Sequence, residues 1–149
     1  MPRVKLEMPA HFPFVCSLPV RIADINYGGH LGNDAVLSLF HEARVQYLKS
    51  LNCSELDACG TALIMADVVI VYKNEGFYGD VLQVAVAPEE ISSRGFALFY
   101  RISCDRNNAL VTIAEGRTGM LCFNYETRKV VSLPEALKKK FGNSGPNVG

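Results

Sequence analysis

Four strand-like segments follow one another in the second half of the chain, and no helical pattern interrupts them. They span residues 61–74, 80–91, 94–105 and 109–125. The turn-forming sequences NEGFYGD, SSRG and DRNN separate them. Strands joined by such short connections pair antiparallel, because a parallel pair needs a long crossover. The pattern therefore predicts an antiparallel sheet built from hairpins.

One long helix is predicted ahead of these strands, from Asn33 to about Leu51. Apolar residues recur there at three- and four-residue intervals, which is typical of a helix buried along one side. They are Val36, Leu39, Phe40, Ala43, Tyr47 and Leu51. The side chain of Asn33 or Asp34 is expected to cap the helix start by accepting from free backbone N–H groups. A strand over residues 14–22 comes before it, and Pro19 indicates an edge or a bulge in that strand.

The remaining sequence fits one domain over residues 1–141. SLPEALKKKF at 132–141 predicts a short helix, with Pro134 in its first turn and lysines in its last turn. Residues 142–149, GNSGPNVG, are expected to form a disordered tail. The expected architecture is α+β, a curled antiparallel sheet of about five strands wrapped around one long central helix.

The overall composition excludes several classes of partner. The chain has 15 basic and 15 acidic side chains, so no net charge would attract nucleic acid or an anionic membrane. No apolar run approaches the roughly 18 residues of a membrane span, and the first residues lack the apolar core of a signal peptide. The five cysteines form no C-x-x-C pair, which favours free thiols. We expect a cytoplasmic protein that uses neither a metal nor a cofactor.

The residues with the most chemical potential lie in RIADINYGGHLGNDAVL, at positions 21–37. Backbone N–H groups near Gly32 and Asn33 have no partner within the helix and lie at the positive end of its dipole. They can therefore hold a carbonyl oxygen that gains negative charge during a reaction. Gly29 and Gly32 leave room for a ligand to approach the backbone and permit positive φ angles. A flexible turn before a capped helix would show the same pattern.

This segment resembles the hotdog-fold acyl-CoA thioesterases of the 4-hydroxybenzoyl-CoA thioesterase-like family. Members of that family carry a sequence similar to R-Y-x-D-T-D-x-x-G-H-V-N-N, followed by a helix with E-A-R. The counterparts here are Arg21, Asp24, Ile25, Asn26, Gly29, His30, Leu31, Gly32 and Asn33, then Glu42, Ala43 and Arg44. VYKNEGFYGD at 71–80 is similar to the family's Y-x-x-P-A-x-x-G-D, and SSRGFALFYRI at 92–102 resembles its serine-phenylalanine strand start. The resemblance covers about residues 14–130.

The resemblance implies a hotdog fold that hydrolyses an acyl-CoA thioester to a free acid and coenzyme A. The backbone amide of Asn33 would polarise the thioester carbonyl. A homodimer or homotetramer is also implied, in which Asp67 or Arg94 of one subunit would meet the helix start of the other. Lys73 and Arg94 are candidates for holding the phosphates of coenzyme A, and Arg94 is favoured because the resemblance places ligand contacts at its hairpin.

Two departures from the family pattern bear on catalysis. The family's second aspartate, usually assigned as nucleophile or general base, is Asn26 here, and its Pro-Ala pair is Glu75-Gly76. Asn26 can orient a water molecule or hydrogen-bond the thioester, but it cannot act as a carboxylate base. The base would then come from elsewhere. The near candidates are Asp24, His30 and Asp34. The alternative function is that of a non-catalytic acyl-CoA-binding or regulatory protein.

Overall fold

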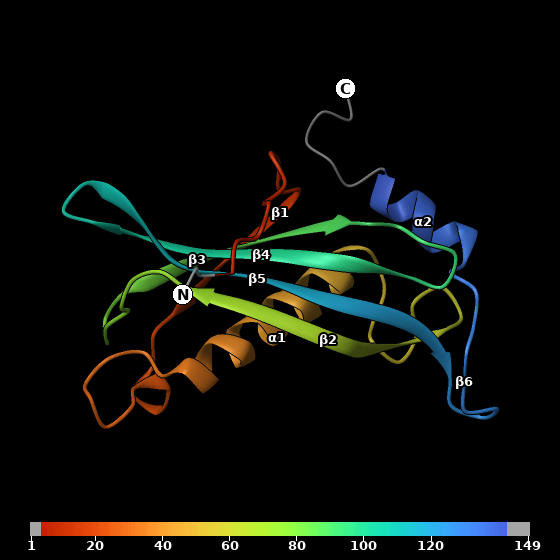
Figure 1. Cartoon of the computed structure of the whole chain (residues 1–149), viewed down its shortest axis with the longest axis horizontal. Coiled ribbons are helices and arrows are strands. Elements are labelled where there is room, and N and C mark those ends of the chain that lie inside the picture. Colours follow the sequence, from red (N-terminus) through yellow and green to blue (C-terminus); the bar gives the residue numbers. More distant parts are fainter. Residues whose placement is uncertain (1–3, 143–149) are drawn as a thin grey trace.

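Helix α1 (Asn33–Ser50) lies across one face of a curled antiparallel sheet (Figure 1). The strands are β1 (Phe14–Pro19), β2 (Ala62–Tyr72), β3 (Val81–Glu89), β4 (Gly95–Arg106), β5 (Ala109–Asn124) and the two-residue β6 (Lys129–Val130). A 3-10 helix, η1 (Ile22–Asp24), precedes α1, and helix α2 (Glu135–Gly142) ends the described chain. This computed structural model describes residues 4–142. The predicted α+β hotdog architecture, a sheet curled around one central helix, is confirmed.

The strand order is β1-β3-β4-β5-β2, with β6 paired to the end of β5. The pairs β3/β4 and β4/β5 are hairpins, as predicted. The expectation of a hairpin at NEGFYGD is wrong, because β2 pairs with β5, from Ala62 opposite Phe123 to Tyr72 opposite Ala114. The turn-forming residues of NEGFYGD suit a hairpin and a longer connection equally. The pairing of β2 with the distant β5 therefore determines where β2 lies in the sheet. Residues 73–80 therefore cross from an edge of the sheet to β3.

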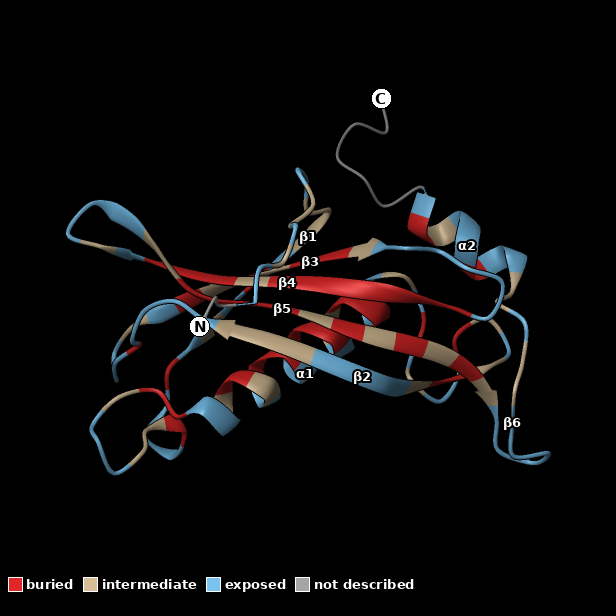
Figure 2. Cartoon of the chain, viewed as in Figure 1, coloured by how far each residue is buried: buried red, intermediate tan, exposed pale blue. Residues whose placement is uncertain are grey.

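The apolar stripe of α1 packs against the sheet (Figure 2). Phe40 is fully buried, and its ring stacks on that of Tyr100 in β4 with 4.5 Å between the centroids. Alternate residues of β4, such as Leu98 and Ile102, are buried in the same core cluster. Removing these apolar surfaces from water stabilises the fold by about 25 cal/mol per Å². The same packing fixes the position of the helix start.

Three local predictions differ from the structure. The first strand ends at Pro19 instead of residue 22, and Pro19 does lie on an edge strand. The predicted cap of α1 by Asn33 or Asp34 is wrong, since the capping position is Gly32 and the two polar residues are already inside the helix. Gly142 belongs to α2, so the predicted tail starts too early, and residues 143–149 lie outside the described residues.

Two predictions from composition can be compared with the described residues. All five cysteines are free thiols, and four of them are buried. Between residues 4 and 142, no helix combines the length and the apolar character needed to cross a bilayer.

Candidate functional site

The start of α1 borders a cavity of about 210 Å³. The loop before the helix, the end of β2 and the crossing segment that follows β2 form its walls. Apolar lining comes from Leu31, Val36 and Ile113, and polar lining from His30, Asn33, Lys73 and Glu75. Three of the predicted site residues, His30, Asn33 and Lys73, therefore meet at one cavity.

Asn26 holds the loop that precedes α1. Its Oδ1 accepts hydrogen bonds from the backbone N–H groups of Gly28 at 2.9 Å and His30 at 3.4 Å. Its own N–H donates to the carbonyl of His30 at 2.9 Å. Gly29 has φ +85°, a conformation that residues with side chains rarely adopt. The amide of Asn26 thus shapes the loop that presents His30 to the cavity.

The first turn of α1 carries free backbone donors. The N–H of Ala35 bonds to the carbonyl of Gly32 at 3.1 Å, whereas the N–H groups of Asn33 and Asp34 have no acceptor in the described part of the chain. A Cβ at Gly32 would lie 2.8 Å from Oδ1 of Asp34, so the absence of a side chain at Gly32 leaves the space beside the helix start free. Free N–H groups at a helix start bind anions and polarised oxygens.

The end of β2 contributes two further polar side chains. The hydroxyl of Tyr72 donates to the carbonyl of Asn33 at 3.2 Å, which joins the helix start to the sheet. Partial burial and the nearby Asp34 carboxylate raise the pKa of Tyr72, so the phenol stays a neutral donor. Nζ of Lys73 lies 3.5 Å from Oε1 of Glu115. Lys73 therefore brings a half-exposed cation to the rim of the cavity.

Asp24 is ionised but engaged within its own segment. Its carboxylate bonds to the Arg21 side chain at 3.1 Å and accepts from the Arg21 backbone N–H at 2.9 Å. Burial alone would raise the pKa of Asp24, but the hydrogen bonds and charge of Arg21 outweigh burial and hold that pKa below its usual value. The carbonyl of Asp24 accepts from Gly32, and Asp24 does not line the cavity.

An acidic partner of His30 comes from the crossing segment. Nε2 of His30 lies 3.1 Å from Oε2 of Glu75, and Nδ1 lies 3.4 Å from the carbonyl oxygen of Leu31. The N–H of Leu31 donates to the carbonyl of Gly76 at 2.7 Å, which ties the two segments together. Glu75 was not predicted as a site residue. The one signal for it in the sequence is that it stands where the similar family has Pro-Ala.

Arg94 lies at the other end of the sheet. Its guanidinium donates to the carbonyl of Val130 at 3.2 Å. The next residue, Gly95, pairs with Leu121, whereas the helix start lies near Tyr72 at the opposite end of the β2/β5 pair. Within one chain, Arg94 is therefore not brought to the cavity.

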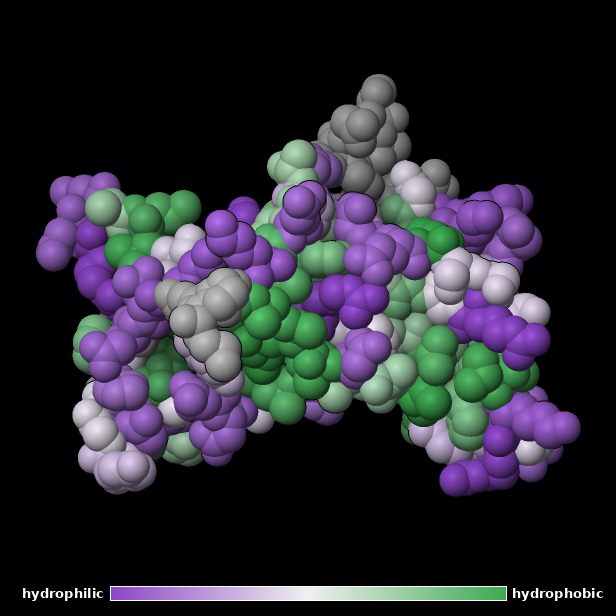
Figure 3. Space-filling view, in the orientation of Figure 1, coloured by the Kyte–Doolittle hydropathy of each residue, from purple (hydrophilic) through white to green (hydrophobic). Residues whose placement is uncertain are grey.

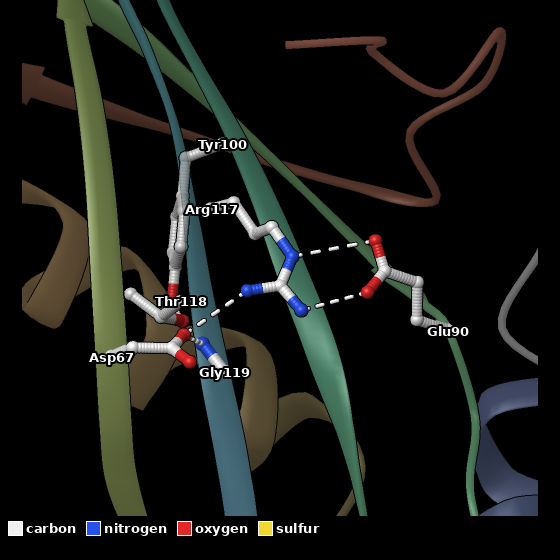
Figure 4. Close-up of polar contacts among 6 residues, drawn as sticks. All are labelled: Asp67, Glu90, Tyr100, Arg117, Thr118 and Gly119. Atoms are coloured by element: carbon white, nitrogen blue, oxygen red, sulfur yellow. Dashed lines mark hydrogen bonds and ion pairs between the residues drawn. The ribbon is translucent and has the colours of Figure 1, made fainter.

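Asp67 belongs to a polar cluster that spans β2, β5 and the end of β3 (Figure 4). Its Oδ1 accepts from Arg117 at 3.0 Å and from the N–H of Gly119 at 3.1 Å. Arg117 also bonds to Glu90, with the shorter contact at 2.7 Å. The cluster lies at a bulge of β2 next to Asp67. Arg117 of the same chain neutralises the negative charge of the Asp67 carboxylate. Nowhere between residues 4 and 142 do three or more His, Cys, Asp or Glu side chains gather in a way that could hold a metal ion.

These features define a hotdog domain with a ligand cavity at the N-terminal end of its central helix. The sequence model of the thioesterase-like superfamily matches residues 20–141, and the chain belongs to that superfamily. The family predicted from the motif around Asp24 and Asn33 is thereby confirmed. A comparison with curated proteins gave no match.

Solved thioesterase structures share this fold. A 1,4-dihydroxy-2-naphthoyl-CoA thioesterase from Synechocystis is 24% identical, with a TM-score of 0.77 over 87% of this chain and 96% of that chain. A thioesterase superfamily protein from Jannaschia sp. CCS1 is 19% identical, with a TM-score of 0.80 over 91% of this chain and 85% of that chain. A thioesterase from Thermus thermophilus, in complex with coenzyme A and zinc, is 19% identical, with a TM-score of 0.75 over 91% of this chain and 96% of that chain.

Proposed function

We propose that this protein hydrolyses an acyl-CoA thioester to the free acid and coenzyme A. The observation that carries the proposal is the cavity at the start of α1, where the N–H groups of Asn33 and Asp34 are free, in a chain of the thioesterase-like superfamily. The naphthoyl-CoA thioesterase and the coenzyme A complex among the similar structures support a CoA thioester as substrate. Free thiols favour a reducing compartment, so we place the reaction in the cytoplasm.

The thioester carbonyl would dock on the N–H of Asn33. Negative charge develops on that oxygen when water attacks, and a fixed donor in a sheltered site stabilises it. Gly29 and Gly32 keep the loop and the helix start close to the substrate, and Asn26 holds the loop in shape. Of the predicted bases, His30 lines the cavity, whereas Asp24 is bonded to Arg21 and positions the loop.

The cavity favours a small acyl group. Its volume of about 210 Å³ exceeds the roughly 150 Å³ of a protein cavity that binds benzene. Leu31, Val36 and Ile113 would contact a short aliphatic or single-ring acyl group. Lys73 stands at the rim, where its ammonium can bind a phosphate of coenzyme A.

A homodimer would bring Arg94 to this site. β2 is an edge strand, its apolar side chains Met65 and Val68 are 40% and 38% exposed, and hydrophobic surface gathers over it in Figure 3. If two β2 strands paired antiparallel about a two-fold axis, the Ala62 end of one would lie beside the Tyr72 end of the other. Arg94 of the second copy, which lies near the Ala62 end, would then approach the first copy's cavity, whereas Asp67, at the middle of β2, would lie near the two-fold axis. A homotetramer would be two such dimers.

The proposed dimer is tested by measuring the mass in solution. Light scattering after size exclusion should give twice the chain mass, or four times for a tetramer, and a monomeric wild type would contradict the proposal. Val68→Lys places a charge in the proposed interface and should shift the mass to that of one chain. Val45→Lys, on the exposed face of α1, is the matched control and should leave the mass unchanged.

The activity is tested by a thiol-release assay with short, medium, long and aromatic acyl-CoA substrates. We expect release of free coenzyme A from at least one short or aromatic substrate. The alternative is non-catalytic binding, favoured by Asn26 standing where the similar family has a carboxylate. Calorimetric binding of an acyl-CoA without thiol release from any substrate would establish that alternative.

The role of the Asn33 amide is tested by a proline substitution. Asn33 is the first residue of α1, where proline fits a helix, and Gly32 has φ −73° and ψ 150°, which suit a residue before proline. Asn33→Pro should therefore fold while lacking the N–H, and kcat should fall by about 100- to 1000-fold. Asn33→Ala keeps the N–H and is the matched control. Equal activities of the two variants would contradict the assignment.

A further inference from the structure

Glu75 is the one carboxylate among the described residues that line the cavity. Its Oε2 faces Nε2 of His30 at 3.1 Å, while Oε1 has no hydrogen-bond partner in the part of the chain that the structure describes. The side chain is 62% exposed, so water and a ligand can reach it. Glu75 therefore combines a free acceptor oxygen with a place beside the helix start.

The backbone around Glu75 is held in place on two sides. The guanidinium of Arg106 donates to the Glu75 carbonyl at 3.2 Å and to the Asp80 carboxylate at 2.6 Å. On the other side, the Gly76 carbonyl accepts from Leu31, and a Cβ at Gly76 would lie 3.2 Å from the Leu31 side chain. This close contact fixes the distance between the crossing segment and the loop before α1.

His30 orients the carboxylate. Its two ring nitrogens face two acceptors, the Leu31 carbonyl and the Glu75 carboxylate. The bond between Nε2 and Oε2 holds one oxygen of Glu75, which leaves Oε1 to bind water. The loop that carries His30 is itself fixed by Oδ1 of Asn26.

The other candidate bases and the Asn26 amide do not offer a free oxygen in this cavity. Asp34, in the first turn of α1, does not line it. Oδ1 of Asn26 accepts two backbone N–H groups, and Asp24 is bonded to Arg21 outside the cavity. The thioester carbonyl would lie at the Asn33 N–H, which borders the same cavity as Glu75. Glu75 and the Asn33 N–H thus share one cavity, which is where a general base that activates water beside the bound carbonyl has to lie.

We propose that Glu75 is the general base of this enzyme and supplies the carboxylate that position 26 lacks. The inference rests on the proposed thioesterase function. Glu75 takes one proton from a water molecule, and the water oxygen bonds to the thioester carbon. The carbon–sulfur bond then breaks, and the proton held by Glu75 passes to the departing thiolate, which leaves the free acid and coenzyme A.

The test compares Glu75→Gln with wild type on the acyl-CoA that wild type turns over fastest. Glutamine keeps the size and a hydrogen-bond acceptor for His30 but cannot accept the proton of water, so kcat should fall by about 100- to 10,000-fold with KM nearly unchanged. Glu75→Asp should retain part of the activity. Glu126→Gln, an exposed acid in the β5–β6 turn, is the matched control and should match wild type.

Chemical rescue separates a catalytic role from a structural one. Glu75→Ala leaves space at the cavity, so added formate should raise its rate in a concentration-dependent way while leaving Glu126→Gln unaffected. If wild type releases thiol but Glu75→Gln stays within twofold of it, or if formate has no effect on Glu75→Ala, the assignment of Glu75 is wrong and the thioesterase function stands. If wild type releases no thiol from any acyl-CoA, both the function and the assignment fail.

Discussion

Gly116 of β5 and Phe40 of α1 are in direct contact, and a Cβ atom at position 116 would overlap Cε2 of the ring and lie 2.8 Å from Cζ. The backbone oxygen of Val69 limits the same space at 3.0 Å. The Phe40 ring also stacks, with an interplanar angle of 14°, on Tyr100, the residue of β4 that pairs with Gly116. At Phe40, the central helix can therefore lie this close to β5 because position 116 has no side chain.

Gly116→Ala should destabilise the fold. The added methyl group forces the Phe40 ring or the β5 backbone to move, which costs about 1–3 kcal/mol of unfolding free energy. Urea unfolding followed by circular dichroism measures the loss. In a Phe40→Leu background the same substitution should cost less, with a coupling of at least about 0.5 kcal/mol. Additive effects in this cycle would contradict the proposed contact.

Tyr100→Phe should destabilise the core by a different mechanism. The Tyr100 hydroxyl bonds to Thr118 at 2.7 Å and accepts from the guanidinium of Arg44 at 3.1 Å, and all three residues are buried. Burial raises the pKa of Tyr100, so the hydroxyl is a neutral group in this network. Its removal leaves the Thr118 hydroxyl and one guanidinium nitrogen of Arg44 without this partner, while Arg44 keeps its bond to Glu55, and the loss costs about 1–3 kcal/mol. Thermal unfolding tests this, and Tyr125→Phe, on an exposed ring, should leave the midpoint unchanged.

The elements with strong local patterns could be predicted from the sequence. The apolar stripe from Val36 to Tyr47 identified α1, and the alternation in β3 and β4 identified two of the paired strands. The partner of β2 could not be predicted, because its pairing with β5 depends on residues about fifty positions away. The two-residue β6 carries too short a pattern to be recognised.

Asp24 should make stability depend on acid pH. Its pKa is lowered in the folded protein by Arg21, which outweighs the opposing effect of burial. A lowered folded-state pKa means that the stabilisation is present above the unfolded-state value of about 3.9 and is lost as the pH falls through the lower folded-state value. Asp24→Asn should cost about 1 kcal/mol at neutral pH and flatten the acid side of the stability curve. Urea midpoints from pH 7 to pH 2 measure this, and Asp105→Asn, an exposed acid, should keep the wild-type slope.

The candidate site was only partly predictable because it depends on a long-range contact, as the pairing of β2 with β5 does. The loop from Asp24 to Asn33 is contiguous in sequence, so its glycines and polar residues marked the helix start directly. Glu75 comes to His30 only because residues 73–80 cross to β3 beside that loop, with Leu31 bonded to Gly76. A contact made by the path of a crossing segment leaves no spacing pattern in the sequence.

Moving the carboxylate from position 75 to position 26 should restore activity to a Glu75 variant. Asn26 uses Oδ1 as an acceptor for two backbone N–H groups, and an aspartate oxygen can accept both in the same way. Asn26→Asp should therefore keep the loop and bring a carboxylate close to the helix start, since Cβ of Asn26 lies 3.6 Å from the position of a Cβ at Gly32. In a Glu75→Gln background it should raise kcat at least about tenfold, which corresponds to about 1.4 kcal/mol of activation free energy. Asn26→Ala in the same background is the control, since it lacks both the loop acceptor and the charge, and it should lower activity further. Thiol release measures all three variants, and a double variant no faster than Glu75→Gln alone would show that a carboxylate at position 26 cannot replace the one at position 75.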